Sequence, residues 1–140
     1  MSPAAYLRLR REAAGLTLDD VATRLAPQIV NRPTAYALVR LWEADGVVAE
    51  IADVIRLRAV FRFDVTVYRQ LVEEPADRHP RICRSCACSQ DDACIDGAAG
   101  SCAWSSDDFC TRCEAREIRN DPAWMTAAMD RTTRVESAAA

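Results

Sequence analysis

Residues 7–22 read Leu-Arg-Leu-Arg-Arg-Glu-Ala-Ala-Gly-Leu-Thr-Leu-Asp-Asp-Val-Ala, a pattern that ends one helix and starts another. Apolar residues at helical spacing predict an amphipathic helix over 4–14, and Gly15 stands where a helix commonly ends in a left-handed residue. Thr17, with Asp20 three residues later, is a typical N-cap for a second helix over 18–25. The segment therefore predicts two helices joined by a short turn.

The helical pattern continues to about residue 74. A connection over 26–33 contains two prolines and precedes a third helix, which we expect Thr34 to cap and Gly46 to close. A fourth helix is expected over 49–60 and a fifth over 65–71. Six per cent aromatic residues and four glycines in 140 residues argue against a β-sandwich or barrel. The predicted fold class is mainly α.

Three segments of this helical part match one known family in order. They are residues 7–22, the run Val-Arg-Leu-Trp-Glu-Ala-Asp-Gly over 39–46, and two helices over 51–71 with Phe-Asp-Val between them. Together they resemble the Cro/CI-type (Xre-like) helix-turn-helix transcriptional regulators over about residues 4–72. The resemblance implies a five-helix bundle that binds double-stranded DNA. The connection over 26–33 departs from the family pattern, because it is longer and lacks glycine.

The family's docking mode implies that the start of the third helix enters the major groove. The residues that would then face DNA are Asn31, Arg32, Ala35, Tyr36, Ala37 and Arg40. Few of these groups read bases, and 12 arginines in residues 1–82 are nearly balanced by 11 acidic residues. One copy should bind DNA weakly, so we expect a homodimer or a partner such as RNA polymerase. The alternative is a protein–protein adaptor that keeps the bundle without specific DNA binding.

All seven cysteines lie within the 31 positions from Cys83 to Cys113. The N-terminus carries charged residues where a secretory signal would be apolar, so we expect a cytoplasmic protein. In a reducing cytosol such a cluster is more typical of metal binding than of disulfides. Two Cys-x2-Cys pairs 23 residues apart suit one tetrahedral zinc site. Its predicted ligands are Cys83, Cys86, Cys110 and Cys113.

Three further cysteines, Cys88, Cys94 and Cys102, are one ligand short of a second zinc site. The fourth ligand is left open between His79, otherwise interpreted as an exposed linker residue, and a nearby carboxylate. The candidate carboxylates are Asp91, Asp92, Asp96, Asp107 and Asp108. An iron–sulfur cluster and a Cys94–Cys102 disulfide are the other interpretations. We expect Trp104 and Phe109 to cover the metal core.

The cysteine spacing over 83–113, with its Asp-x-Cys and Cys-x-Trp steps, also resembles small modules of phage-associated and mobile-element proteins. This resemblance implies a metal-binding module and not an enzyme. Catalysis has little other support, because the chain lacks a Gly-rich phosphate loop and a histidine near a candidate nucleophile. Zinc bound by four thiolates also has no open position to activate water.

The predicted organisation has four parts. A helix-turn-helix domain over 1–74 is followed by a linker over 75–82 that contains two prolines. A loop-rich zinc module over 83–113 precedes a helical tail over 114–140. The apolar residues that share one face of the tail are Trp124, Met125, Ala128 and Met129; we expect them to pack on the protein itself, the alternative being a self-association or partner helix. The predicted function is transcription regulation, with the zinc module supporting dimerisation or partner contact.

Overall fold

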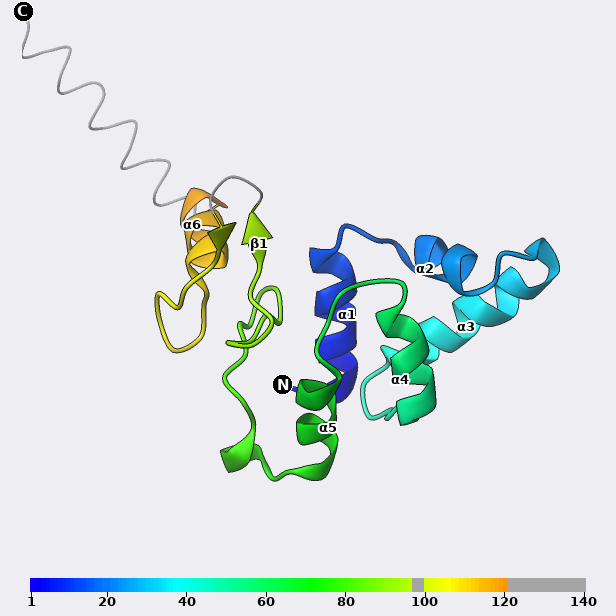
Figure 1. The fold of residues 1–140 in the computed structure, drawn as a ribbon, viewed down its shortest axis with the longest axis horizontal. Coiled ribbons are helices and arrows are strands. Elements are labelled where there is room, and N and C mark those ends of the chain that lie inside the picture. Colours follow the sequence, from blue (N-terminus) through cyan, green and yellow to red (C-terminus); the bar gives the residue numbers. More distant parts are fainter. Residues whose placement is uncertain (97–99, 121–140) are drawn as a thin grey trace, which may run out of the picture.

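The computed structural model describes residues 1–96 and 100–120 of the chain (Figure 1). The α-helices in this part are α1 (Pro3–Ala13), α2 (Leu18–Leu25), α3 (Arg32–Trp42), α4 (Ile51–Arg58), α5 (Val65–Glu73) and α6 (Thr111–Asn120). Two 3₁₀ turns, η1 (Ile29–Asn31) and η2 (Ala76–Arg78), and a two-residue pair of strands, β1 (Ile95–Asp96) and β2 (Gly100–Ser101), complete it. The expected mainly-α fold class is confirmed. The tail residues Trp124, Met125, Ala128 and Met129 lie outside the described ranges.

The turn between α1 and α2 forms as the sequence predicts. Gly15 adopts φ +71°, and the N–H groups of Gly15 and Leu16 donate to the carbonyls of Glu12 and Arg11 at 2.9 and 3.2 Å. The Thr17 hydroxyl then accepts the Asp20 N–H at 3.1 Å, while the Asp20 carboxylate accepts the Thr17 N–H at 2.8 Å. These reciprocal bonds satisfy donors that a helix start otherwise leaves unpaired.

The start of α3 differs from the prediction. The helix begins at Arg32 directly after η1, with Asn31 in the cap position and no side-chain capping bond. Pro33 lies in the first turn, where its missing N–H costs nothing and its fixed φ suits the helix. Thr34 is therefore inside the first turn, and its predicted role as the cap is wrong.

A single apolar core joins the first five helices. α2 packs against α3, while α5 packs against α1 and α4. Two fully buried tyrosines fix loops to this core, and burial raises the pKa of both. The Tyr68 hydroxyl bonds the N–H and C=O of Ala49 at 2.8 and 3.0 Å, and the Tyr6 hydroxyl bonds the N–H and C=O of Asp64 at 3.0 and 3.2 Å. Each hydroxyl is thus satisfied inside the core.

The described part of the cysteine block, residues 83–96 and 100–113, lies against α1 on the side away from α2 and α3 (Figure 1). Ile82 packs against the bundle core, and Ala87 of the block is itself buried within that core. The block and the bundle therefore share apolar packing. Among the described helices, none combines the length and apolar character that crossing a membrane requires.

Candidate functional site

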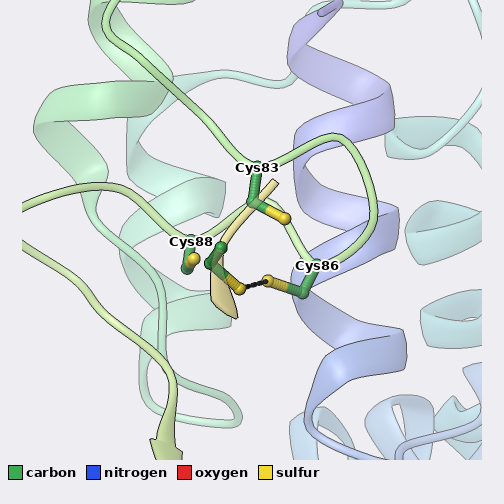
Figure 2. A group of neighbouring side chains, drawn as sticks. Cys83, Cys86 and Cys88 are labelled. Atoms are coloured by element: carbon green, nitrogen blue, oxygen red, sulfur yellow. Dashed lines mark hydrogen bonds between the residues drawn. The ribbon is translucent and has the colours of Figure 1, made fainter. Parts of the chain in front are cut away.

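The first three cysteines form one tight knuckle at the start of the block. The Ala87 N–H donates to the Cys83 carbonyl at 2.9 Å, and the Cys83 N–H donates to the Cys88 carbonyl at 3.0 Å. Ala87 adopts φ +56°, a left-handed conformation that costs an L-residue about 1–2 kcal/mol. This reversal of the chain turns Cys88 back towards Cys83 and Cys86, and Figure 2 shows the three side chains gathered around one point.

A short hairpin brings the middle cysteines together. β1 and β2 pair antiparallel, with Ile95 opposite Ser101. Cys94 and Cys102 flank these strands, and the Cys102 N–H donates to the Cys94 carbonyl at 2.9 Å. The Cys94 N–H in turn donates to the Cys102 sulfur at 3.2 Å. An isolated antiparallel β-bridge between Trp104 and Cys110 brings Cys110 back to the other cysteines.

The sulfur atoms form two sets of four, each with all Sγ atoms within 4.8 Å of one another. One set is Cys83, Cys86, Cys88 and Cys110, and the other is Cys88, Cys94, Cys102 and Cys110. Thiolates about 2.3 Å from a tetrahedral zinc lie about 3.8 Å apart, so these separations fit a metal ion. Thiolate donors suit soft or borderline cations such as zinc and iron. The cysteine block can therefore hold metal.

These two sets of sulfur atoms differ from the ligand sets that the sequence predicted. Cys88 takes the place predicted for Cys113, which belongs to neither set among the described residues, although it is buried nearby at the start of α6. Burial raises the pKa of the Cys113 thiol to about 12. The second set is completed by Cys110 and not by His79, whose Nε2 lies 2.8 Å from the Glu74 carbonyl. Spacing along the chain carried no signal that one sulfur could serve two sets.

Most of the predicted carboxylate ligands pair with arginines. The Asp107 carboxylate pairs with Arg81 at 3.3 Å, and that of Asp108 pairs with Arg84 at 2.8 Å. Asp91 is exposed and joins neither sulfur set, and the side chain of Asp96 lies outside the described part. The cysteines are thus the metal donors that the described fold assembles.

Protons cannot stay on all of these sulfurs once a metal binds. A hydrogen bond with Cys86 lowers the pKa of both Cys83 and Cys94, that of Cys94 to about 2. Hydrogen bonding with Cys83 raises the pKa of both Cys86 and Cys88. Within the cluster Cys86 and Cys88 therefore keep their protons, and their hydrogen bonds favour the ionised form of Cys83 and Cys94. A cation that replaces those protons would stabilise every sulfur as a thiolate, and its affinity would fall with acidity.

Two aromatic rings cover the cluster, as predicted. Trp104 and Phe109 are partly buried and pack against the cysteines. The Arg81 guanidinium lies 4.3 Å from the centre of the Trp104 ring and donates to the Ser106 carbonyl at 2.6 Å. This stacking fixes the indole over the metal-binding region.

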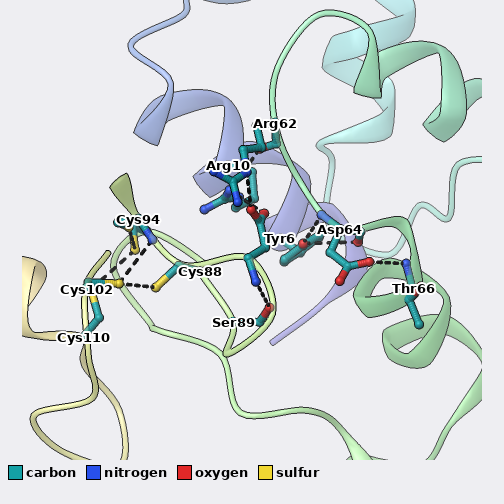
Figure 3. Close-up of polar contacts among 12 residues, drawn as sticks. Tyr6, Arg10, Arg62, Asp64, Thr66, Cys88, Ser89, Cys94, Cys102 and Cys110 are labelled. Atoms are coloured by element: carbon teal, nitrogen blue, oxygen red, sulfur yellow. Dashed lines mark hydrogen bonds and ion pairs between the residues drawn. The ribbon is translucent and has the colours of Figure 1, made fainter. Parts of the chain in front are cut away.

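Asp92 joins the cysteine block to the bundle through ion pairs with Arg10 and Arg62, two side chains that lie side by side in Figure 3. Its carboxylate is buried, with the residue 5% exposed, and pairs with the Arg10 Nη2 and Arg62 Nε at 2.6 Å each. Arg10 also donates to the Arg62 carbonyl at 3.1 Å. Asp92 was a candidate metal ligand, but here it satisfies two arginines. Sequence reasoning missed this contact, because nothing in the separation of residues 10 and 92 indicates it.

A second buried ion pair closes the bundle between α1 and the end of α3. The Arg11 guanidinium makes two bonds to the Glu43 carboxylate, at 2.7 and 2.8 Å. It also donates to the Leu16 carbonyl at 2.7 Å in the turn before α2. The bonds to Glu43 raise the pKa of Arg11. Arg10 and Arg11 therefore stabilise the fold through buried ion pairs, and neither guanidinium is exposed to solvent.

The predicted DNA-contact residues divide into an exposed and a buried group. Asn31, Tyr36, Ala37 and Arg40 are exposed. Ala35 is only 9% exposed and packs with Ala22 and Ala26 between α2 and α3, so its predicted base contact is wrong. Arg32 is half-buried and donates to the Pro27 carbonyl at 3.3 Å. Tyr36, Ala37 and Arg40 are thus exposed along α3, while Asn31 and Arg32 lie where this helix begins.

Apolar side chains are also exposed just before α3 and near its end. Ile29 and Val30 in η1 are 77% and 79% exposed, and Leu41 is 51% exposed. Such residues in adjacent positions are unusual on a surface that contacts only phosphate, and they are typical of protein contacts.

No family model matches the chain, and comparisons with curated proteins and with solved structures gave no match either.

Proposed function

We propose that the protein is a DNA-binding transcription regulator of a phage or mobile element, with a metal-stabilised block attached to its helix-turn-helix bundle. The observation that carries this proposal is the outer face of α3, where Tyr36 and Arg40 are exposed one helical turn apart on a helix held by α2, with Asn31 exposed just before the helix begins. An exposed helix of this kind can enter the major groove, where Asn and Arg read adenine and guanine edges.

The available charge supports a modest affinity for DNA. Arg10 and Arg11 are engaged in buried ion pairs, so phosphate contacts fall to exposed arginines such as Arg40 and Arg56. Each neutralised phosphate contributes about 0.9 to the slope of log K against log salt. A single copy with few such contacts would bind weakly, and a homodimer doubles the number. Dimerisation on a two-fold operator is therefore part of the proposal.

The metal-binding block has a structural role in this proposal. Its contacts with Arg10 and Arg62 fix the side of α1 that faces away from α3. A block of thiolate ligands without an open coordination position offers no catalysis, so we assign no enzymatic activity. Its other surfaces are free to contact a second copy or a partner such as RNA polymerase.

A second candidate function is a protein–protein adaptor. The exposed Ile29, Val30 and Leu41 favour it, because they would be covered by a partner protein more readily than by DNA. The adaptor would use the same side of the bundle. The two functions therefore make opposite predictions for DNA binding by this surface.

The deciding experiment measures binding of the full chain to its own upstream DNA and to scrambled DNA by fluorescence anisotropy at physiological salt. Arg40→Ala and Tyr36→Ala should each weaken specific binding about tenfold, the effect of losing 1–2 kcal/mol of contact. Arg69→Ala is the matched control, since Arg69 is exposed on α5 and pairs only loosely with Glu73 at 3.7 Å. Absence of specific binding at micromolar protein would reject DNA recognition and favour the adaptor.

A further inference from the structure

We infer that the cysteine block holds one binuclear metal centre, in which Cys88 and Cys110 each bridge two zinc ions. Cys83 and Cys86 would complete the shell of one ion, and Cys94 and Cys102 that of the other. The inference goes beyond the proposed DNA-binding function and does not depend on it. It replaces the idea of two separate zinc sites, or of one site with three spare cysteines.

The number of ligands favours sharing. Two separate tetrahedral thiolate sites need eight cysteines, whereas the chain has seven. Six of those seven supply both sulfur sets, because Cys88 and Cys110 occur in each. A thiolate sulfur has enough lone pairs to bind two cations at once. Two complete shells are then available without a histidine or carboxylate, in agreement with the other partners found for His79, Asp107 and Asp108.

The positions of the sulfurs match a shared centre. Cys88 and Cys110, the two common members, are buried, and their sulfurs lie within 4.8 Å of every other sulfur in both sets. Cys110 is 3.9 Å from Cys86 in one set, and Cys88 is 3.8 Å from Cys102 in the other. The unshared members also meet, since the sulfurs of Cys86 and Cys94 are 3.2 Å apart. No layer of protein separates the two sets, so two ions would occupy adjoining tetrahedra.

The charge of a binuclear centre suits its surroundings. One divalent ion with four thiolates and two ions with six thiolates both carry about −2, so the second ion adds no net charge. Arg10, Arg62 and Arg112 line the hollow beside Cys94. Arg10 is buried, and its Nε has no hydrogen-bond partner among the described residues. Arg10 and Arg62 share the single carboxylate of Asp92, so this edge stays positive and would offset the residual negative charge in a region of reduced dielectric.

The test uses the full chain purified under reducing conditions. Native mass spectrometry should find two zinc ions per chain. After replacement of zinc by cadmium-113, the NMR spectrum should show two metal signals that are coupled to each other through the shared sulfurs. One ion per chain, two uncoupled signals, or iron with visible absorbance would overturn the binuclear zinc centre.

Two single variants identify the bridging ligands. Cys88→Ser should reduce the metal content to one ion or none, while Cys113→Ser should keep two ions and the coupled cadmium signals. Cys113 is the matched control because it is buried beside the cluster but belongs to neither set among the described cysteines. The opposite result, loss of an ion from Cys113→Ser and two ions in Cys88→Ser, would reject Cys88 as a bridge. The cadmium coupling in the unaltered protein remains decisive even if Cys88→Ser fails to fold.

Discussion

The helical bundle and the cysteine block are held together by different kinds of contact. Fully buried side chains in the bundle are mainly large and apolar or aromatic, among them Tyr6, Leu7, Val54 and Leu57. Among the described residues of the block the fully buried positions are cysteines and Ala87, and its two large aromatic residues, Trp104 and Phe109, are only partly buried. Regular structure shows the same contrast, since the described part of residues 83–110 has four residues in paired strands and no α-helix.

This contrast separates two sources of folding free energy. Burial of apolar surface contributes about 25 cal/mol per Å², and the bundle has enough such surface to fold by this means. The block is too short and too poor in large apolar residues to do so, and a metal bound by its thiolates can supply the missing free energy. The two regions should therefore respond differently to the same perturbations.

Metal removal should give the largest effect. Treatment with a strong chelator and a thiol reductant should unfold the block, because structural zinc contributes about 10–16 kcal/mol in small zinc-binding peptides. The bundle should keep its helices. Hydrogen exchange followed by mass spectrometry should show lost protection over 83–113 and retained protection over 1–74. Equal loss in both regions, or none in the metal-free block, would contradict the contrast.

Removal of the buried Arg11–Glu43 ion pair of the bundle should cause the next largest loss of stability. Glu43→Gln leaves the Arg11 guanidinium buried without its anion and should destabilise the protein by about 3–5 kcal/mol in urea unfolding. Glu12→Gln is the control, since Glu12 also meets Arg11, at 3.4 Å, but its side chain is 52% exposed. That change should cost about 0–1 kcal/mol. Similar costs for both variants would show that burial does not decide the strength of this pair.

Removal of the Asp92 contact between the block and the bundle should cause an intermediate loss of stability. Asp92→Asn removes the anion from Arg10 and Arg62 and should cost about 2–3 kcal/mol, less than a fully buried pair because Arg62 is 56% exposed. Its metal content should not change. Asp91→Asn, at an exposed neighbouring position, should be neutral in both measurements. Loss of metal from Asp92→Asn alone would instead identify Asp92 as a ligand.

Substitution of Thr17, the N-cap of α2, should cause the smallest loss of stability. Thr17→Ala removes the hydroxyl that accepts the Asp20 N–H and should lower the free energy of unfolding by about 1 kcal/mol, whereas Thr17→Ser should keep most of it. The comparison uses thermal unfolding at neutral pH. A deficit in Thr17→Ser as large as that in Thr17→Ala would show that the methyl group, and not the cap, matters.

The same cap predicts a dependence on pH. Hydrogen bonds from the Thr17 side chain and then from its backbone N–H lower the pKa of Asp20. The folded state therefore binds this proton less readily than the unfolded state, and the resulting stabilisation is present above the ordinary Asp pKa of about 4. It is lost as the pH falls through the lowered value. The difference between the original chain and Thr17→Ala should accordingly shrink in acid.

Local sequence patterns predicted most of the bundle. Helix α2 has the predicted bounds, α1 and α5 agree within two residues, and the Gly15 turn and Thr17 cap form as expected. The start of α3 was missed because Pro33 fits the first turn of a helix as well as the loop before one. These features depend on residues a few positions apart, where spacing and backbone preference suffice.

Long-range contacts required the tertiary structure. The sequence by itself determined that seven thiols lie in one short block and that a mainly helical part precedes them, because composition and periodicity are local properties. It left open which sulfurs meet. Only the folded chain brings Cys88 and Cys110 into both sulfur sets and Asp92 to Arg10, since such pairings depend on how distant segments pack in three dimensions.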